Sequence, residues 1–581
     1  MSNKHTAKKI QLSKNHKYYI NWIGGVVIIL LVNLIGSFFY AGIDLTADKR
    51  YTITDASLKY VKELQHPLEL TVYIKGEVPA GFKKLANAAE NISNNYHRIS
   101  NGNFSIRFEK PGEGLSDSAK AYLFDSLQQL GVHPTNVKSQ ATDRSQTEET
   151  LVFPGAVLTG ENGQIGIDFL EGQSSLDGLD ALNNATSQLE YKITRAIKIL
   201  ERSKIPVVGY LAGNGEVLDL QVYDLIENVL KKEYGFGLIQ IDSIPFIPHQ
   251  FDILLINKPM RPFTEKQKLM IDQYIMLGGK VIWALDNLYA SMDSLQKSNG
   301  SFLAYDMGLN LDDQLFKYGV RINRDLVQDL ESDQVPSIVG NIGDKPQIQL
   351  LPWPYAPLVS DFVSHPISRN LDKVLTSFPQ SIDTISTTGI SKNILLSSSI
   401  YGKKIPTPAL VEWKPVKTES DLQSFQVQHI PVAVLLEGTF PSLYKNRISI
   451  EEQLSFERTT GGKYLSNSIS NQMIVISDGD IFLNPVSEED GPLTMGSNKY
   501  TRIQYGNKEF FKNILFYLSD GKDLLSSRSK NFQLRLLNKE LLKEQTAFWK
   551  IFNLLTPVLI LLICMLIFRQ TRMRKYSRIS I

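Results

Sequence analysis

The stretch FDILLINKPMRPFTEKQKLMIDQYIMLGGKVIWALD, residues Phe251–Asp286, decides the fold class of this chain. Residues 251–257 are a short apolar run typical of a buried strand, and residues 280–285 are a second one. Between them, Thr264 is placed to cap the start of a helix, and Gly278-Gly279 to end it. Parallel strands need a crossover connection, which is usually a helix. The stretch therefore predicts an α/β fold with a parallel sheet.

The same alternation continues on both sides of this stretch, and we expect an α/β region from about residue 181 onward. Its further elements are a helix at 189–202, a strand at 205–211 and a helix at 223–234. The short apolar runs at 431–436 and 473–476 are expected to return to the same sheet. Residues 302–470 otherwise predict a loop-rich insertion, with tight prolines around Trp353. Together these elements fit a doubly wound α/β domain.

A smaller α/β region comes before it in the chain. Apolar spacing predicts helices at 54–64 and 81–99 and strands at 68–74 and 103–108. A helix between two strands indicates a βαβ unit, as in a thioredoxin-like fold that lacks the C-x-x-C motif. Residues 112–149 are polar and are expected to be partly irregular. Runs at 151–159 and 164–169 flank Gly160–Gly163 and predict a hairpin.

Two hydrophobic stretches lie near the ends of the chain: INWIGGVVIILLVNLIGSFFYAGI, residues 20–43, and FWKIFNLLTPVLILLICMLIF, residues 548–568. About 20 residues of helix cross the ~30 Å core of a bilayer, so each is long enough to span it. The first is longer than a signal-peptide core and no A-x-A site follows it, which favours an uncleaved anchor. The predicted plan is a cytoplasmic basic tail (1–19), transmembrane helix 1 (20–43), a first extracytoplasmic α/β domain (44–180), a second one with the insertion (181–530), an amphipathic connector (531–547), transmembrane helix 2 (548–568) and a cytoplasmic basic tail (569–581).

The charges beside these two stretches predict their orientation, because Lys and Arg stay on the cytoplasmic side of membrane segments. Each tail has five basic residues and no acidic one. They are Lys4, Lys8, Lys9, Lys14 and Lys17, and Arg569, Arg572, Arg574, Lys575 and Arg578. We therefore expect both termini in the cytoplasm and the central region on the opposite side of the membrane. Outside the tails, 52 Lys and Arg face 60 Asp and Glu, a net charge of −8.

The composition and motifs exclude several kinds of site. The single cysteine, Cys564, lies in the second hydrophobic stretch, so the central region has no disulfide, cysteine nucleophile or thiolate metal site. No two histidines lie within five residues of each other, which leaves no local zinc motif. No G-x-x-x-x-G-K-[ST] phosphate loop and no G-x-S-x-G elbow is present. We predict no catalytic, cofactor-binding or metal-binding residues, no enzyme activity and no nucleic-acid partner.

Two turns that follow strands are candidates for ligand chemistry. Gly213-Asn214-Gly215 lies between a strand and a helix, where phosphate-binding turns occur. Leu218 stands where the dinucleotide fingerprint has its third glycine, so a tight structural turn is the favoured interpretation. The carboxylates of Asp478-Gly479-Asp480 would suit a cation, although a plain strand-end turn is commoner.

Two further groups have a simpler alternative role. Glu216 and Asp219 would line the crevice at the strand ends, where ligands of open α/β sheets bind, or they would lie in a solvated loop. Trp353 and Tyr355, next to prolines, would form an aromatic binding patch or pack beneath a long loop.

Several motifs, taken in their order, are similar to those of one family. They are DLTADKRYTIT at 44–54, GYLAGNGE at 209–216, the stretch 251–286, KYGV at 317–320, HPI at 365–367, EGTFPS at 437–442 and SDGD at 477–480. With the two hydrophobic anchors, they cover most of the chain from Asp44 to the second anchor. The chain resembles the GldG-type gliding-motility proteins, which are auxiliary, substrate-binding-like components of an ABC transporter.

The resemblance implies an exported domain related to a glutamine-amidotransferase-like α/β fold. That fold would be non-catalytic here, because the cysteine that such enzymes use is absent. The resemblance also implies a separate membrane permease and a separate cytoplasmic ATPase, in bacteria that glide on surfaces. With the predicted topology, it places the anchors in the bacterial inner membrane and the central region in the periplasm. It supplies no catalytic residues.

Three functions remain open from the sequence. The leading hypothesis is a non-enzymatic, membrane-anchored auxiliary subunit that docks on the permease in the lipid bilayer and holds an α/β domain outside. The second is an extracytoplasmic solute-binding subunit for a small-molecule or cell-envelope ligand. The third is an enzyme whose site is assembled from residues far apart in the chain.

Overall fold

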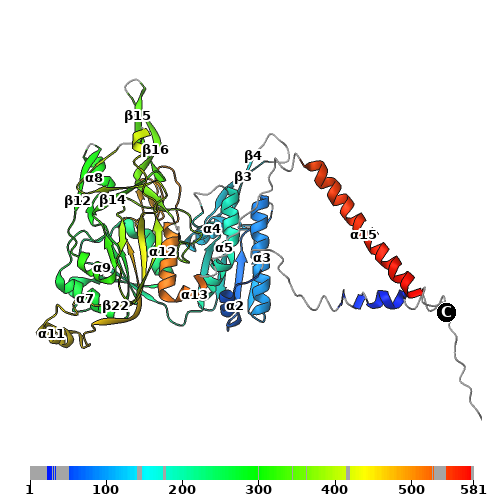
Figure 1. Ribbon diagram of the computed structural model, residues 1–581, viewed down its shortest axis with the longest axis horizontal. Coiled ribbons are helices and arrows are strands. Elements are labelled where there is room, and N and C mark those ends of the chain that lie inside the picture. The colour runs from blue at the N-terminus through cyan, green and yellow to red at the C-terminus, as the bar shows by residue number, and fades with distance from the viewer. Residues whose placement is uncertain are drawn as a thin grey trace, which may run out of the picture. The chain divides into compact units, whose positions relative to one another are not determined.

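The computed structural model describes residues 22–28, 30–31, 33–34, 52–76, 78–140, 147–173, 178–298, 300–342, 345–360, 363–413, 416, 419–525, 528 and 545–576. The chain forms two units, residues 1–531 and residues 532–581. The first unit contains two lobes with separate sheets, which we call the first lobe (residues 52–200) and the second lobe (residues 205–528). The protein is thus a mixed α/β protein, as predicted (Figure 1).

The first lobe is built on a four-stranded sheet in the order β2-β1-β5-β6. The strands are β1 (Leu68–Val72), β2 (Phe104–Phe108), β5 (Gly155–Gly160) and β6 (Gly163–Asp168). β1 and β2 are parallel and α3 (Ala80–Ile99) connects them, which confirms the predicted βαβ unit. α2 (Asp55–Lys62) begins at the start of the helix predicted at 54–64, where the Thr54 hydroxyl accepts the N–H of Ser57.

Residues 112–149 were expected to be partly irregular, and they combine turns and irregular segments, at 112–116 and 130–134, with regular elements. They contain α4 (Asp117–Gln129), β3 (Thr135–Gln140) and the start of β4 (Thr147–Val152). α4 packs Leu127 with Val157, on the opposite face of the sheet from the core that contains Leu158. Leu123, Phe124 and Leu130 pack in the same cluster as Leu127, so α4 has a short apolar face in its second half.

The helix α5 (Gly178–Leu200) contributes to the cores of both lobes. Its residues Leu189, Ile193 and Ala196 are buried in the core of the first lobe. Tyr191, from the same helix, is buried in a core of the second lobe. The helix predicted at 189–202 is therefore the second half of a longer one that connects the two lobes.

The second lobe contains a seven-stranded sheet in the order β19-β22-β23-β10-β9-β7-β8. Its strands are β7 (Val207–Ala212), β8 (Gly235–Gln240), β9 (Ile253–Asn257), β10 (Lys280–Ala284), β19 (Ile390–Ser397), β22 (Pro431–Pro441) and β23 (Asn467–Ile476). The five strands from β8 to β23 are mutually parallel. β22 pairs antiparallel with β23, and β19 pairs antiparallel with β22 at the edge. The runs at 431–436 and 473–476 do return to the sheet, as predicted.

Helices cover both faces of this sheet, as a doubly wound domain requires. α7 (Glu265–Met276) starts at the predicted Thr264 capping box and is followed by Gly278 at φ 97°. α7 and α9 (Asp312–Tyr318) share one apolar core with the sheet, and α12 (Asn507–Phe516) shares another. The remaining helical pieces are η1 (Leu220–Val222), the π-helix η2 (Asp224–Leu230), α6 (Lys231–Glu233), η3 (Ile241–Ser243), η4 (Tyr517–Gly521) and α13 (Lys522–Leu525).

The predicted loop-rich insertion contains more β-structure than expected. The strands in it or just before it are β11 (Leu288–Tyr289), β12 (Ser301–Asp306), β13 (Val320–Ile322), β14 (Asp325–Asp329), β15 (Ser332–Ile342), β16 (Lys345–Val359), β17 (Val374–Leu375), β18 (Ile382–Thr384), β20 (Gly402–Pro406) and β21 (Ala409–Glu412). They form small sheets of two or three strands. Short helices and strands complete this lobe: α8 (Met292–Lys297), α10 (Glu419–Leu422), α11 (Ile450–Thr460), β24 (Val486–Ser487) and β25 (Gly491–Pro492).

The second unit contains α15 (Thr546–Tyr576), the red helix of Figure 1. Its segment Phe548–Arg574 is long and apolar enough to cross a membrane, and it is the one such helix in the described part of the chain. Its apolar side chains are exposed. Most of the predicted first span, residues 20–43, and of the predicted connector, residues 531–547, lies outside the described residues.

Candidate functional site

The carboxyl edge of the seven-stranded sheet is the first place to look for a site. In chain order the parallel strands are arranged two-one-three-four-five, so the order reverses between β7 and β9. Ligands of open α/β sheets bind outside the strand ends at such a reversal. The turns at Gly213–Glu216, Lys258, Asp286 and Asp478–Asp480 all follow strands at this edge.

The turn after β7 is held by a hydrogen bond of its own and by two from the segment that follows β9. Gly213 and Gly215 have φ values of 140° and 87°, which favour glycine. The Asn214 carbonyl accepts the N–H groups of Met260 and Arg261, both at 2.8 Å. The Glu216 carboxylate accepts the Asn214 N–H at 2.8 Å. This is the geometry of a tight structural turn.

The segment after this turn does not form a phosphate cradle. The first helical piece is the short η1, and the Asp219 carboxylate accepts the N–H of Gln221 at 2.8 Å. A carboxylate therefore already occupies the position at which a helix start would bind an anion. Glu216 is buried, and burial raises the pKa of its carboxyl despite hydrogen bonds from the backbone.

The side chain of Lys258 lies among the carboxylates at this edge of the sheet. Its ammonium contacts Asp480 and lies 3.5 Å from a carboxylate oxygen of Asp286. Asp286 accepts the N–H of Gly479 at 2.7 Å, and Asp478 accepts the N–H of Ser377 at 2.8 Å. Asp478 and Asp480 were predicted to bind a cation or to form a strand-end turn. In the structure, the positive charge beside them is the ammonium group of Lys258. Within the described ranges, no group of three or more His, Cys, Asp or Glu is placed to hold a metal ion.

Asp286 is expected to make stability depend on pH. Burial raises the pKa of its carboxyl to about 6, although Lys258 opposes the shift. Its stabilising contribution is therefore complete below pH 3.8, the ordinary value, and is lost as pH rises through about 6. The Asp286→Asn variant lacks this titration. We expect wild type to gain up to about 3 kcal/mol relative to the variant between pH 7.5 and pH 4. Denaturant unfolding of both proteins across this range measures the difference, and parallel pH profiles would contradict it.

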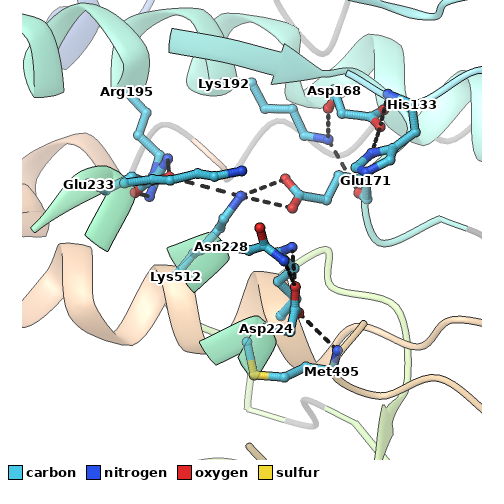
Figure 2. Close-up of polar contacts among 12 residues, drawn as sticks. His133, Asp168, Glu171, Lys192, Arg195, Asp224, Asn228, Glu233, Met495 and Lys512 are labelled. Atoms are coloured by element: carbon cyan, nitrogen blue, oxygen red, sulfur yellow. Dashed lines mark hydrogen bonds and ion pairs between the residues drawn. The ribbon is translucent and has the colours of Figure 1, made fainter. Parts of the chain in front are cut away.

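A second cluster of charged residues lies where the two lobes meet (Figure 2). Lys512 of α12 donates to both oxygens of Glu171, at 2.8 and 3.1 Å, and lies 3.9 Å from Glu233. Arg195 of α5 pairs with Glu233, with one N–O distance of 3.3 Å. Figure 2 shows the Lys512 ammonium between these two carboxylates. Glu171 and Arg195 belong to the first lobe and Lys512 and Glu233 to the second, so the ion pairs cross between the lobes.

These charges stabilise one another inside the protein. Burial disfavours ionisation of Glu171, but the ammonium groups of Lys512, Lys508 and Lys192 outweigh it and hold its pKa well below its usual range. Burial likewise opposes ionisation of Glu233, and Arg195 and Lys512 lower its pKa. The cluster therefore remains ionised at neutral pH.

Other contacts hold the two sides of this interface in place. Lys192 donates to the carbonyls of Asp168, Phe169 and Glu171 at 2.9, 3.1 and 3.3 Å, which fixes the turn after β6. In the second lobe, Asp224 accepts from Lys508 at 3.0 Å and from the N–H of Met495 at 2.9 Å. The cavity that remains, lined by Glu171, Lys192, Arg195, Glu233, Glu509 and Lys512 among others, has a volume of about 40 Å³. That is room for water rather than for a solute.

Trp353 and Tyr355 do not form an exposed aromatic patch. Trp353 is 1% exposed and Tyr355 is 6% exposed. They pack with Phe378 and with the stacked ring of Trp413 in the core of the insertion. The packing interpretation is confirmed.

Comparison with protein families identifies the second lobe. Residues 205–514, more than half of the chain, match the family described as ABC-type uncharacterized transport system. The chain belongs to this family. Residues 47–159 match a domain of unknown function, DUF7088. A search of curated proteins gives no match. A solved structure titled "mmIFT52 N-terminal domain" is 10% identical and covers 54% of this chain and 98% of its own, with a TM-score of 0.29.

As a member of the ABC-type transport family, the protein is an auxiliary component of an ABC-type transport system. The matched range contains the whole seven-stranded sheet and the Lys258 cluster. Glu171, Lys192 and Arg195, which connect the lobes, fall between the two matched ranges. Sequence reasoning missed this interface, because the partners lie far apart in the chain: Lys512 is 341 residues from Glu171, and Arg195 is 38 residues from Glu233. The sequence did offer one signal of a polar contact here: the basic residues Lys192 and Arg195 lie beside the apolar face of α5.

Proposed function

We propose that this protein is a non-enzymatic, membrane-anchored auxiliary subunit of an ABC transporter that serves bacterial gliding motility. It docks on the permease, while a separate cytoplasmic ATPase supplies the energy. Both of its termini face the cytoplasm of the cell, and the two lobes stand in the periplasm.

One observation carries this proposal: a lobe of the ABC-type transport family is joined in the same chain to α15, whose apolar side chains are exposed. Apolar side chains on every face of a long helix are the mark of a membrane segment. The basic residues after Phe568 favour a cytoplasmic carboxyl terminus.

The contact between the lobes supports coupling rather than ligand capture. Solute-binding proteins close two domains around a cleft by a hinge. Here α5 enters both cores, and ion pairs whose side chains are 10–22% exposed fill the junction around a cavity of about 40 Å³. The two lobes are thus built to move as one body. We also propose that the first lobe is thioredoxin-like and that the second is related to non-catalytic glutamine-amidotransferase-like folds.

The test is recovery of the complex from native membranes in mild detergent, through a tag on the full-length chain. We expect mass spectrometry to find a polytopic permease and an ATPase with a phosphate loop, in a constant ratio to this protein. A version that ends at residue 545, without α15, is the control and should lose both. Recovery of neither subunit with the full chain would contradict the proposal.

A solute-binding role is the second candidate, because one surface groove has the size of a ligand site. Its volume is about 760 Å³, within the usual range of ligand pockets. It is lined by Asp312, Asp313, Phe316, Lys317, Arg321, Ile322, Asn323, Arg324, Leu443, Asn446 and Arg447. Binding to the folded state raises apparent stability, so soluble cell-wall fragments should raise the melting temperature if this role holds. Replacing Arg321 and Arg447 by Ala should then abolish the shift.

A further inference from the structure

The two faces of α15 differ in the kind of side chain that they carry. At about 3.6 residues per turn, one face presents Asn553, Pro557, Ile560, Cys564 and Ile567, which we call the Asn553 seam. The opposite face presents only large apolar side chains. They are Ile551, Leu555, Val558, Leu559, Leu562, Met565 and Leu566. The polar and irregular features of the helix core therefore gather on one side.

The backbone of α15 also leaves a carbonyl without its helical hydrogen-bond donor on the same side. Pro557 has no N–H, so it cannot donate to the carbonyl of Asn553, four residues earlier. The hydroxyl of Thr556 does not replace it, because it donates to the carbonyl of Phe552 at 2.6 Å. Asn553 thus offers a carbonyl without its helical donor as well as a side-chain amide. Inside a bilayer such groups need a partner, because no water can serve them.

Asn553 lies deep enough for this demand to matter. Trp549 is the kind of residue that marks a membrane interface, and Asn553 follows it by four residues, about 6 Å along the helix. From Trp549 to Arg569 the helix rises about 30 Å, the thickness of the hydrocarbon core. The spacing of the seam alternates between four and three residues. That is the repeat of helices that pack side by side with a left-handed crossing.

Like-charge repulsion disfavours two of the helices that could cover the seam. Arg569, Arg572 and Arg574 lie at the cytoplasmic end of α15. A parallel second copy would place the same arginines together, and the stretch at residues 20–43 would bring lysines to the same boundary. A helix of another subunit can avoid this repulsion. We propose that the Asn553 seam docks on a transmembrane helix of the permease, which donates a hydrogen bond to Asn553 and has no basic cluster beside these arginines. This inference rests on the proposed function.

Site-specific photo-crosslinking in native membranes tests the seam. The photoreactive residue p-benzoylphenylalanine is placed in the full-length chain at Ile560 or Ile567, and at Leu562 or Leu566 as matched controls on the opposite face. We expect adducts with the permease, identified by mass spectrometry, from the two seam positions at a yield at least about five times that of the controls. In parallel, Asn553→Leu should lower the permease recovered with the tagged chain at least about fivefold, whereas Leu562→Ala should leave it unchanged.

The outcomes separate this inference from the function on which it rests. Equal adducts from both faces, or adducts with this chain alone, would overturn the seam while permease and ATPase still co-purify with wild type. Recovery of neither subunit with wild type would remove both the proposed function and the seam. Normal permease recovery with Asn553→Leu would also count against the seam.

Discussion

Replacing Lys512 with methionine is expected to destabilise the contact between the two lobes by about 3–5 kcal/mol. Lys512 is 16% exposed and faces the carboxylates of Glu171 and Glu233, which are 22% and 10% exposed. Methionine keeps much of the volume but leaves two carboxylates close together with less compensating charge. Removing one partner of a buried ion pair costs far more than the pair itself contributes, because the remaining charge is still desolvated.

Hydrogen exchange is the measurement that localises this effect. We expect amides of α5 and α12 to exchange faster in Lys512→Met, with amides of the four-stranded sheet unaffected, because the first lobe keeps its own core. Lys373→Met is the matched control. Lys373 pairs with Glu331, and both are more than 40% exposed, so its loss should cost no more than about 1 kcal/mol. Equal effects of the two variants would contradict a buried interface.

Acid should weaken the same interface. The pKa of Glu171 is held below its ordinary value of 4.5, so its contribution is complete above that pH and is lost as pH falls through the folded-state value. The Glu171→Gln variant lacks this contribution at every pH. The gap in stability between wild type and Glu171→Gln should therefore shrink between pH 5 and pH 2.

Gly438→Ala is expected to cost roughly 3 kcal/mol or more, the second large effect. Gly438 lies in β22 with φ at 146°, and a methyl group there would stand 2.0 Å from the backbone carbonyl of Gly389. The two strands must separate to admit it, which breaks the pairing of β19 with β22 at the edge of the seven-stranded sheet. A backbone atom, unlike a flexible side chain, cannot move aside alone.

Gly340→Ala is the matched control for this prediction. Gly340 also lies in a strand, but the nearest atom to an added methyl is a side-chain oxygen of Gln347 at 3.9 Å. Thermal unfolding of the full-length protein in detergent should show a clear loss of melting temperature for Gly438→Ala and almost none for Gly340→Ala. A similar small change in both would show that β19 adapts to the methyl group.

Helix ends could be predicted from the sequence, because the residues that form them are close together in the chain. Thr264 and Gly278 define the ends of α7, and Thr54 caps α2, because capping involves residues three or four positions apart. The insertion at 302–470 was misjudged for the opposite reason. Apart from β19, β22 and β23, its strands pair with partners inside the insertion or just before it, in small sheets whose pairing gives no local signal.

Charge pairs between distant residues could not be predicted from the sequence. Lys512 lies 341 residues from Glu171, and Lys258 lies 222 residues from Asp480. Each looks like an ordinary surface lysine until the fold brings its partner to it. Asp478 and Asp480 were recognised as a noteworthy pair, but the ammonium that balances them gives no local signal.

The sharing of α5 has a practical consequence for producing pieces of this protein. A fragment that starts at residue 205 would expose the surface that Tyr191 covers on α12, where its hydroxyl donates to Asn513 at 3.0 Å. A fragment that ends at residue 180 would lose the helix that shields α3. Either half should aggregate when expressed by itself, whereas a piece covering residues 52–528 should stay in solution, because each hydrophobic surface then retains its cover.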